Sequence, residues 1–402
     1  MKSPDEEKLL EVEIERLLPG GVGLAHSEGL TLFVSLAAPG DVLRVSIDRV
    51  QGKVGFASIV EILKPSAARV EPPCPYFGRC GGCDFQQLTY QAQLDAKVEI
   101  IRDCLHRIAK IDALIGTPLE IRITPSPHEW RYRARANWQV DLPGKLLGYF
   151  ERGSNRVCDV EYCAVLTPEL QGTLERVRGA IVADNAIDRL RDVDAVAGDE
   201  GVSVAPPRAG FTTDIVSRRI GNETYYFSAE AFFQVNHELL EPLIAEGIGD
   251  ARGKTAVDLY CGVGLFTLPL ARRFERVTGV EAHPVATEFA RRNVEFAQLT
   301  NAKVVTARVG DWLNQHARSL GPVDFLLLDP PRTGCENKDI AGILALHPAR
   351  IAYVSCDPAT LARDLKKLIA AGYSIDSIAA FDMFPQTHHV ETVSHLRRVN
   401  SF

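Results

Sequence analysis

A cysteine at the end of an apolar segment is the first candidate for chemistry. Cys356 follows IAYVS, which has the length of a buried strand, and precedes PATLARD, which has the character of a helix start. A helix N-terminus lowers the pKa of a thiol and favours the nucleophilic thiolate. Most buried cysteines are inert apolar residues, but Cys356 shares its strand-end position with Asp258 and Asp329. Cys261, inside a glycine loop, and Cys335, in a turn with no helix behind it, are weaker candidates.

The segment VDLYCGVGLF combines an apolar strand, a glycine-rich turn and the start of a helix. Gly262 and Gly264 allow the backbone to approach a ligand closely, and the N–H groups of a helix terminus point into the same space. The next strand ends in Glu281, where a carboxylate can accept hydrogen bonds from both hydroxyls of a ribose. A dinucleotide site requires a third glycine where this chain has Thr267. The pattern therefore favours a nucleoside cofactor without a pyrophosphate, such as S-adenosylmethionine, and a plain tight turn is the alternative.

Two further segments place carboxylates where ligands or protons can reach them. In LLLDPPRTG, Asp329 ends an apolar strand, and ligands of open α/β sheets bind at the carboxyl ends of the strands. The prolines cannot continue strand pairing, so the chain must leave the sheet there. In HHVETV, Glu391 is a candidate general base, although a carboxylate in a strand is more often a surface residue.

Cys74, Cys80 and Cys83 follow a C-x5-C-x2-C spacing with glycines between them. Glycines permit a tight path that turns several sulfur atoms towards one point. Zinc and iron–sulfur sites both commonly use four thiolates, and the candidates for a fourth ligand are Cys158 and Cys163. The spacing does not distinguish zinc from an iron–sulfur cluster.

The segment WRYRARANW predicts a basic strand. A period of two places Arg131, Arg133 and Arg135 on one face of that strand. Aromatic side chains that can stack on bases flank them at Trp130, Tyr132 and Trp138. We expect this strand to contact nucleic acid, and a solvated stripe of arginines is the alternative.

The remaining patterns predict three successive regions. Residues 9–62 hold short strands between turns such as PGGVG and AAPGD, which is typical of a small β-barrel. Strands over 129–163 and helix over 168–197 predict a mixed central region. From about residue 229, helices alternate with the strands TAVDLY, RVTGVE, AKVVTA, DFLLLD and IAYVS, which predicts a mostly parallel sheet covered by helices. The last two segments, SIDSIAAFDMF and HVETVSHLRR, predict an antiparallel pair.

The composition is that of a globular protein. Of 402 residues, 46% are apolar and 24% charged, and the formal net charge is −7. The acidic balance argues weakly against a nucleic-acid partner, but a binding site needs only a local basic face. No apolar segment has the roughly 20 residues that span a bilayer, and the polar first residues do not resemble a secretory signal. We expect a cytoplasmic protein with no membrane partner, in which cysteines do not form disulfides.

Together these segments resemble the RNA 5-methyluridine methyltransferase family over essentially the whole chain. Seven motifs in the order of the family carry the resemblance: CPYFGRCGGCDFQ, YRARA, FFQVN, DLYCGVGLFTLPLA, LDPPRTG, YVSCDPATLARDL and HVETV. The resemblance implies a multidomain α/β protein. Its expected parts are a TRAM domain, which is a small OB-like RNA-binding β-barrel, at 1–64, a central α+β domain with an iron–sulfur cluster at 65–228, and a Rossmann-like methyltransferase domain at 229–402.

The resemblance also assigns roles to residues. Cys356 corresponds to the nucleophile and Glu391 to the base. CAVLTPEL resembles the segment of the family that supplies the fourth thiolate, so a [4Fe–4S] cluster is implied on Cys74, Cys80, Cys83 and Cys163. The positions that contact S-adenosylmethionine are matched by Gln234, Tyr260, Gly262, Leu265, Glu281, Asp311 and Asp329. Some members carry asparagine where this chain has Leu265, so we expect a changed cofactor contact there without loss of activity.

The implied reaction transfers a methyl group from S-adenosylmethionine to C5 of a uridine in RNA. C5 of uracil is a poor nucleophile, and addition of the Cys356 thiolate at C6 turns the ring into an enolate whose C5 can attack the methyl group. Glu391 then removes the C5 proton so that the thiolate can leave. We expect the uridine to be flipped out of its stack into a pocket lined by Phe232 and Phe233.

The expected substrate is ribosomal RNA, because a TRAM domain with a cluster is more typical of the 23S ribosomal RNA enzymes than of the bacterial transfer RNA enzyme. Transfer RNA is the alternative, and we expect the protein to be a monomer. A cytosine-C5 enzyme would use the same thiolate addition. An NAD-linked oxidoreductase with an iron–sulfur centre is disfavoured by the missing third glycine, and a non-catalytic RNA-binding iron–sulfur protein by the intact motifs.

Overall fold

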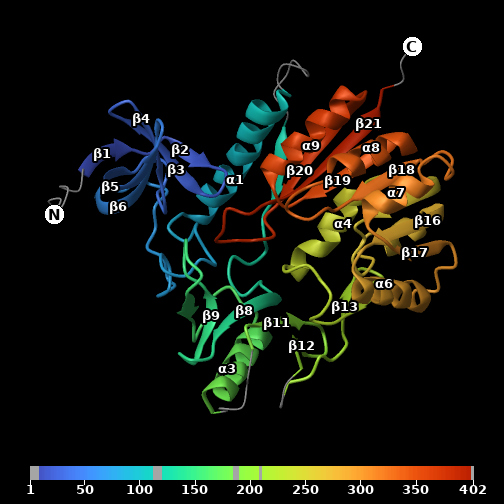
Figure 1. The fold of residues 1–402 in the computed structure, drawn as a ribbon, viewed down its shortest axis with the longest axis horizontal. Coiled ribbons are helices and arrows are strands. Elements are labelled where there is room, and N and C mark those ends of the chain that lie inside the picture. Colours follow the sequence, from blue (N-terminus) through green and yellow to red (C-terminus); the bar gives the residue numbers. More distant parts are fainter. Residues whose placement is uncertain (1–8, 112–119, 184–189, 208–210, 400–402) are drawn as a thin grey trace.

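The computed structural model of the protein describes residues 9–111, 120–183, 190–207 and 211–399. These residues form four β-sheets with helices packed around them (Figure 1). Within this described part, no helix is both long and apolar enough to cross a membrane.

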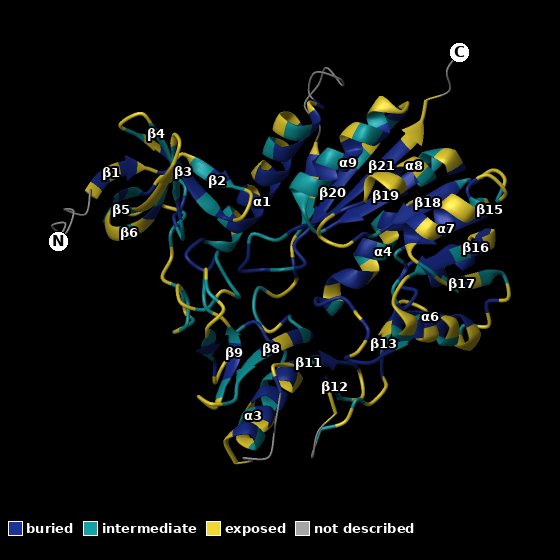
Figure 2. Cartoon of the chain, viewed as in Figure 1, coloured by how far each residue is buried: buried dark blue, intermediate teal, exposed yellow. Residues whose placement is uncertain are grey.

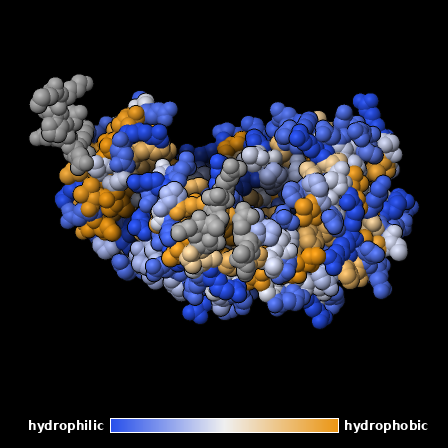
Figure 3. All heavy atoms as spheres, turned by 60° about the horizontal axis from the view of Figure 1, so that its bottom comes forward, coloured by the Kyte–Doolittle hydropathy of each residue, from blue (hydrophilic) through white to orange (hydrophobic). Residues whose placement is uncertain are grey.

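The N-terminal sheet has the strand order β1-β5-β6-β4-β3-β2. Its strands are β1 (Leu9–Glu13), β2 (Arg16–Leu18), β3 (Val22–Ser27), β4 (Leu30–Val34), β5 (Val42–Gln51) and β6 (Val54–Lys64). The outer strands β1 and β2 follow each other directly in the chain, so the sheet is curled. The short strands predicted for this region are therefore confirmed. β5 and β6 expose Val50, Val60 and Ile62, and apolar side chains gather on the surface of this sheet (Figure 3).

The central sheet has the order β10-β9-β8-β11-β12, and α3 (Pro168–Ala183) packs against it. Its strands are β8 (Arg135–Asp141), β9 (Leu146–Phe150), β10 (Val157–Asp159), β11 (Asp192–Ala197) and β12 (Val202–Ala205). The prediction of helix as far as residue 197 is wrong at its end, because Asp192–Ala197 is a strand. Val193 and Ala195 alternate into the core beside β8, and this contact favours a strand there.

The C-terminal sheet has the order β17-β16-β15-β18-β19-β21-β20-β7. The predicted parallel strands are β15 (Gly253–Leu259), β16 (Phe274–Glu281), β17 (Ala302–Thr306), β18 (Phe325–Leu328) and β19 (Arg350–Ser355). The predicted antiparallel pair at the end of the chain is β20 (Tyr373–Phe381) and β21 (Glu391–Arg398). β21 also pairs antiparallel with β19, which places it inside the sheet.

Helices cover both faces of this sheet, so its central strands β15, β18 and β19 are buried over most of their length (Figure 2). On one face lie α4 (Leu240–Ile248), α5 (Thr267–Ala271), α6 (Pro284–Phe296) and the hairpin β13 (Val216–Ile220) with β14 (Glu223–Phe227), after the short helix η2 (His237–Leu239). On the other lie α1 (Tyr90–Cys104), η1 (Leu105–Ala109), α7 (Val309–His316), α8 (Asn337–Leu346) and α9 (Pro358–Ala370). Successive residues of β18 enter the two cores alternately, which explains its continuous apolar sequence.

The middle of the chain completes this C-terminal unit. β7 (Ile121–Thr124) pairs in parallel with β20, and α1 packs beside α9. Lys97 of α1 forms an ion pair with Asp382, which follows β20, and both side chains are fully buried. Lys97 also donates a hydrogen bond to the carbonyl of Phe384 at 3.0 Å. The eight-stranded sheet is thus held by residues from well before position 229.

Removal of one partner of the buried Lys97–Asp382 pair should destabilise the protein strongly. Lys97→Met leaves an unpaired buried carboxyl, and the expected loss is about 3–5 kcal/mol of unfolding free energy in urea denaturation. The double variant Lys97→Met, Asp382→Leu should recover most of that loss, because no buried charge remains. The control is Arg102→Met on the same helix, which breaks an exposed pair with Glu99 and should cost no more than about 1 kcal/mol. Equal losses of unfolding free energy in Lys97→Met and Arg102→Met would show that burial of the Lys97–Asp382 pair does not set the cost of breaking it.

Candidate active site

The loop after β15 lies at the carboxyl edge of the C-terminal sheet, beside the end of β16. Asp258 near the end of β15 is fully buried and accepts a hydrogen bond from Thr267 Oγ1 at 2.5 Å. Glu281, the last residue of β16, accepts hydrogen bonds from the backbone amides of Gly262 at 3.2 Å and His283 at 2.8 Å. The predicted ribose carboxylate and the predicted glycine loop are thus in direct contact.

The glycine loop leaves open space above it. A Cβ atom added to Gly262, whose φ is +54°, would meet no atom within 4 Å. Gly264 has φ +94°, and Tyr260 has φ +61°, a conformation that a bulky residue adopts only under constraint. The hydroxyl of Tyr260 donates to Asp339 at 2.8 Å, so the loop is tied to the start of α8. This rigid, open turn is suited to hold a nucleoside.

The remaining predicted cofactor residues lie at different depths. Gln234 Nε2 lies 3.5 Å from Asp329 Oδ2, so the structure brings these two together across distant parts of the chain. Leu265 is buried, and its carbonyl accepts a hydrogen bond from Tyr225 at 3.0 Å. Asp311 is exposed on the first turn of α7. Leu265 therefore packs in the core beneath the loop, and Asp311 stands at the surface.

Cys356 and Glu391 face each other because of the register of two strands. β19 pairs antiparallel with β21, and the last pair of the ladder is Ser355↔Thr392. One step further along both strands places Cys356 opposite Glu391. Cys356 is half-buried and Glu391 is buried at 3% exposure, with no hydrogen-bond partner for its Oε1 in the described part of the chain. A thiol and an unpaired carboxyl thus share one edge of the sheet.

The expectation that the helix lowers the pKa of Cys356 is wrong. Burial, followed by the charges of Glu391 and Asp329, raises the pKa of this thiol to about 12. The N-terminus of α9 is capped instead by Asp357, which accepts a hydrogen bond from the Thr360 amide at 2.8 Å. Asp357 thus occupies the Thr360 amide at this helix end, and its charge adds to the raised pKa of the thiol.

The carboxyl groups of this edge disfavour each other's charge. Burial raises the pKa of Asp258 to about 7, with a contribution from the charges of Asp329 and Glu281 against the opposing hydrogen bond of Thr267. Burial and the charge of Asp329 raise the pKa of Glu391 well above its ordinary value. Such a concentration of perturbed groups in one place is typical of active sites.

Arg332 is a residue of this site that the motif analysis did not single out. Its charge lowers the pKa of Cys356 and of Glu391, in both cases against the larger effect of burial. It stands in LDPPRTG three residues after Asp329. In the sequence, Arg332 could have been found because it is a positively charged residue within LDPPRTG, the motif that was chosen for Asp329.

The predicted basic strand does not exist in the expected form. β8 begins at Arg135, and Arg131 lies outside it with φ +57°. Arg135 donates to the carbonyls of Ala231 at 2.8 Å and Ala229 at 3.1 Å, so it supports a neighbouring loop. Arg133 turns towards the cysteines. The arginines therefore do not share one strand face.

The aromatic residues of that segment and of FFQVN also differ from expectation. Tyr132 is 4% exposed and Trp138 fully buried, so the prediction that they stack on bases is wrong. Phe233 is 2% exposed and stacks on Phe227 at 4.0 Å between ring centroids, so its place in a uridine pocket is also wrong. The neighbouring ring of Phe232 is 57% exposed, with the guanidinium group of Arg135 5.7 Å from its centroid.

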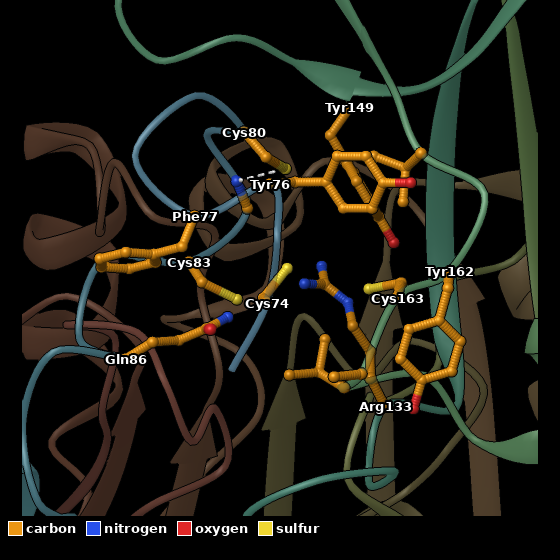
Figure 4. A pocket seen from close by; sticks show the side chains of 14 residues that line it. Cys74, Tyr76, Phe77, Cys80, Cys83, Gln86, Arg133, Tyr149, Tyr162 and Cys163 are labelled. Carbon is orange, nitrogen blue, oxygen red and sulfur yellow. Dashed lines mark hydrogen bonds between the residues drawn. The ribbon is translucent and has the colours of Figure 1, made fainter. Parts of the chain in front are cut away.

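Cys74, Cys80, Cys83 and Cys163 line one pocket together with Arg133 and aromatic side chains (Figure 4). Burial raises the pKa of Cys80 to about 12, and the neighbouring thiols add to this effect. Cys158 lies outside the pocket wall and accepts a hydrogen bond from Arg79 Nε at 3.3 Å.

The arginine in this pocket has no acidic partner. Arg133 Nε donates to the carbonyl of Arg135 at 3.0 Å, and its guanidinium lies 5.9 Å from the centroid of the Tyr149 ring. Among the described residues that line the pocket, none is acidic. This half-buried cation is only partly solvated, so a negative group beside it would stabilise its charge.

Comparison with known proteins matches nearly the whole chain to RNA methyltransferases. The family model described as tRNA (uracil-5-)-methyltransferase matches residues 214–399. An uncharacterized RNA methyltransferase of Halalkalibacterium halodurans is 32% identical, and the match covers 98% of this chain and 97% of the relative. The 23S rRNA (uracil(1939)-C(5))-methyltransferase of Pectobacterium atrosepticum is 32% identical, with 96% of this chain and 93% of that protein covered.

A solved structure is similar over the same extent. The tRNA (uracil-54, C5)-methyltransferase of Pyrococcus abyssi, in complex with S-adenosyl-L-homocysteine, superposes with a TM-score of 0.73 at 26% identity. The match covers 96% of this chain and 100% of that one.

Alkylation of Cys356 should show a thiol that is not activated in the free protein. Because the pKa of Cys356 is raised to about 12, the thiolate fraction and the rate with iodoacetamide should rise about tenfold per pH unit from pH 7.5 to 9.5. A free thiol should level off near its pKa of about 8.5. Asp329→Asn removes a repelling charge and should accelerate alkylation, and Arg332→Ala should slow it. Peptide mass spectrometry measures the rates, and a plateau below pH 8 would contradict the assignment.

Proposed function

The chain belongs to the family of S-adenosylmethionine-dependent RNA uracil-C5 methyltransferases, and we propose that it methylates a uridine of 23S ribosomal RNA through a covalent bond from Cys356. The observation that carries the mechanism is the juxtaposition of the Cys356 thiol with the Glu391 carboxyl, which the β19–β21 register places opposite each other. Both lie at the sheet edge that carries the glycine loop and Glu281.

The proposed reaction has three steps at the uracil ring. The Cys356 thiol gives its proton to water, the sulfur bonds to C6, and the electrons of the C5–C6 double bond move to O4 as an enolate. C5 then takes the methyl group as the bond from methyl to sulfonium sulfur breaks, which leaves S-adenosylhomocysteine. The Glu391 carboxylate accepts the C5 proton, the double bond re-forms, and the C6–S bond breaks to release the thiolate.

The environment of Glu391 suits the last of these steps. A raised pKa makes its carboxylate a stronger base than a solvated one, and burial excludes competing water. The charge of Arg332 favours the ionised forms of both Cys356 and Glu391. We assign the binding of S-adenosylmethionine to the glycine loop. Glu281 would bind the ribose of the cofactor, and Gln234 and Asp329 would contact the part of the cofactor that lies deeper in the site.

The exposed ring of Phe232 is the proposed contact for the flipped uracil, in place of the buried Phe233. The curled N-terminal sheet is proposed as a TRAM domain over 1–64, followed by a central domain within 65–228. The Rossmann-like catalytic domain is proposed over 229–402 together with α1 and β7, which pack on its sheet and pair with it. We propose that the protein acts as a monomer in the cytoplasm, where ribosomal RNA is found. Transfer RNA is the second candidate substrate, because the matching family model and the Pyrococcus abyssi structure are named for it.

The variant Glu391→Gln should trap the covalent intermediate. Thiolate addition and methyl transfer remain possible, but the C5 proton stays and the C6–S bond cannot break. A slowly migrating protein–RNA adduct should appear on a denaturing gel, labelled from methyl-labelled S-adenosylmethionine. It should vanish in Cys356→Ala, Glu391→Gln, whereas Cys261→Ala, Glu391→Gln keeps it.

Sequencing of the trapped RNA identifies the substrate in the same experiment. Fragments of 23S ribosomal RNA are expected, and transfer RNA would overturn the choice of substrate. Turnover of Glu391→Gln at the wild-type rate would show that another group is the base.

The four thiols of the cysteine pocket are proposed to hold a [4Fe–4S] cluster. Among the described residues, no group of three or more histidine, cysteine or acidic side chains converges on a single ion. A four-iron cluster takes one thiolate for each iron atom, so its thiols surround a pocket instead of a point. A cluster held by four thiolates would be anionic, and the half-buried guanidinium of Arg133 would supply the opposite charge. Its chemistry here would be structural, as a cross-link between residues 74–83 and Cys163.

Iron content tests this proposal. Anaerobically purified protein should be brown and contain about four irons per chain. Cys163→Ala should lose most of the iron, and the matched variant Cys158→Ala should keep it, because Cys158 lies outside the pocket wall. Stoichiometric zinc without iron, or equal loss in both variants, would overturn the assignment.

A further inference from the structure

The loop between β20 and β21 leads directly into Glu391. It spans residues 382–390, and the backbone of Gln386 within it has φ +69°, a conformation rare for a residue other than glycine. Strain of this kind persists only where the surrounding structure enforces it. We call this segment the base loop.

Residues 71–85, which include Cys74, Cys80 and Cys83, are called the cysteine-rich segment. This segment contacts the base loop from one side. Asp84, the residue after Cys83, accepts a hydrogen bond from the His388 amide at 2.8 Å, and its second oxygen contacts the His388 ring. The backbone amides of Asp84 and Phe85 donate to the carbonyl of Gln386 at 3.1 and 3.0 Å. Both side-chain and backbone groups of Asp84 are therefore directed at the base loop.

Other residues from the middle of the chain hold the same loop. Gln93 of α1 makes two hydrogen bonds to Gln386, at 2.9 and 3.0 Å. Tyr132, adjacent to Arg133 of the cysteine pocket, donates to the carbonyl of Pro385 at 2.8 Å. Two neighbours of the cysteine pocket, Asp84 and Tyr132, thus reach into the loop that precedes the base.

The base loop also forms part of the active-site surroundings. Burial, then the charges of His388 and Arg332, lowers the pKa of His389 to about 3. The charge of Arg332 thus lowers the pKa of His389 as well as that of Cys356 and Glu391. A displacement of the loop would therefore act on the reacting groups directly.

We propose that Asp84 is a positioning residue for Glu391, through which the cysteine-rich segment sets the rate of the elimination step. The inference rests on the proposed role of Glu391 as the base. Glu391 is the first residue of β21. The ladder that starts with its pairing to Phe381 anchors it on one side, and the base loop precedes it directly on the other. A general base must lie within hydrogen-bond reach of the proton that it removes, so a shift of the loop impairs proton removal more than thiolate addition.

Single-turnover kinetics on the full-length protein separate these steps. Wild type, Asp84→Ala and Asp84→Asn are mixed with methyl-labelled S-adenosylmethionine and substrate RNA, and samples are resolved on denaturing gels over time. In Asp84→Ala the adduct should form within about threefold of the wild-type rate but resolve on the order of tenfold to a hundredfold more slowly. Asp84→Asn keeps an oxygen for the His388 amide and should be intermediate.

Control variants distinguish positioning from general damage. Glu71→Ala removes an exposed carboxylate from the same segment and should resolve the adduct at the wild-type rate. His388→Ala removes the ring partner from the side of the base loop without a change in the cysteine-rich segment. It keeps the amide bond to Asp84, so it should slow adduct resolution to an intermediate degree, as Asp84→Asn does. Iron content and thermal unfolding are measured for each variant and should match wild type for Asp84→Asn and His388→Ala.

Several outcomes would overturn the inference. Normal adduct resolution in both Asp84→Ala and His388→Ala would show that the loop does not need this contact. Equal slowing of adduct formation and resolution in both variants would show a merely structural role. If Glu391→Gln traps adduct while the Asp84 and His388 variants behave as wild type, only this inference fails. If Glu391→Gln itself traps no adduct, the proposed role of Glu391 fails, and the inference fails with it.

Discussion

Burial of both faces of the C-terminal sheet is the constraint on which the rest of the molecule depends. Strands such as β18 have apolar residues on each side and helices over both, so polar groups that do chemistry are excluded from their interiors. They gather where the strands end, at Asp258, Asp329 and Cys356. Glu391 reaches the same edge by the opposite route, because β21 runs antiparallel and its first residue lies where β19 ends.

The same burial explains the electrostatics of this edge. Carboxyl groups at neighbouring strand ends lie in a poorly solvated space, so each disfavours the charge of the others, and the pKa values of Asp258, Asp329 and Glu391 are all raised. The Cys356 thiol experiences the same field, against which Arg332 acts in part. A site of this kind holds its protons until a substrate changes its surroundings, and it then offers strong bases.

The two chemical centres of the chain are joined by polar contacts at the base loop. Residues 84–132 and 382–388 are distant in sequence, and their contacts include the buried Lys97–Asp382 pair and the bonds of Gln93 and Asp84. Buried polar networks of this type specify one arrangement, because a displaced partner leaves an unsatisfied group behind. The cysteine pocket is lined by Cys74, Cys80 and Cys83, the last of which directly precedes Asp84 in the chain.

The sequence by itself determined the alternation of helices and strands after residue 229, the glycine loop, the strand-end positions of Asp329 and Cys356 and the grouping of Cys74, Cys80 and Cys83, whereas Cys163 was chosen over Cys158 from the family resemblance. These features depend on local periodicity, turn chemistry and short spacings, which are written along the chain. Tertiary structure alone decided that Phe233, Tyr132 and Trp138 are core residues and that Arg133 turns into the cysteine pocket. It also decided that burial, with the charges of Glu391 and Asp329, raises the pKa of the Cys356 thiol. Burial and charge at a site are sums over neighbours from distant parts of the chain, so no local pattern contains them.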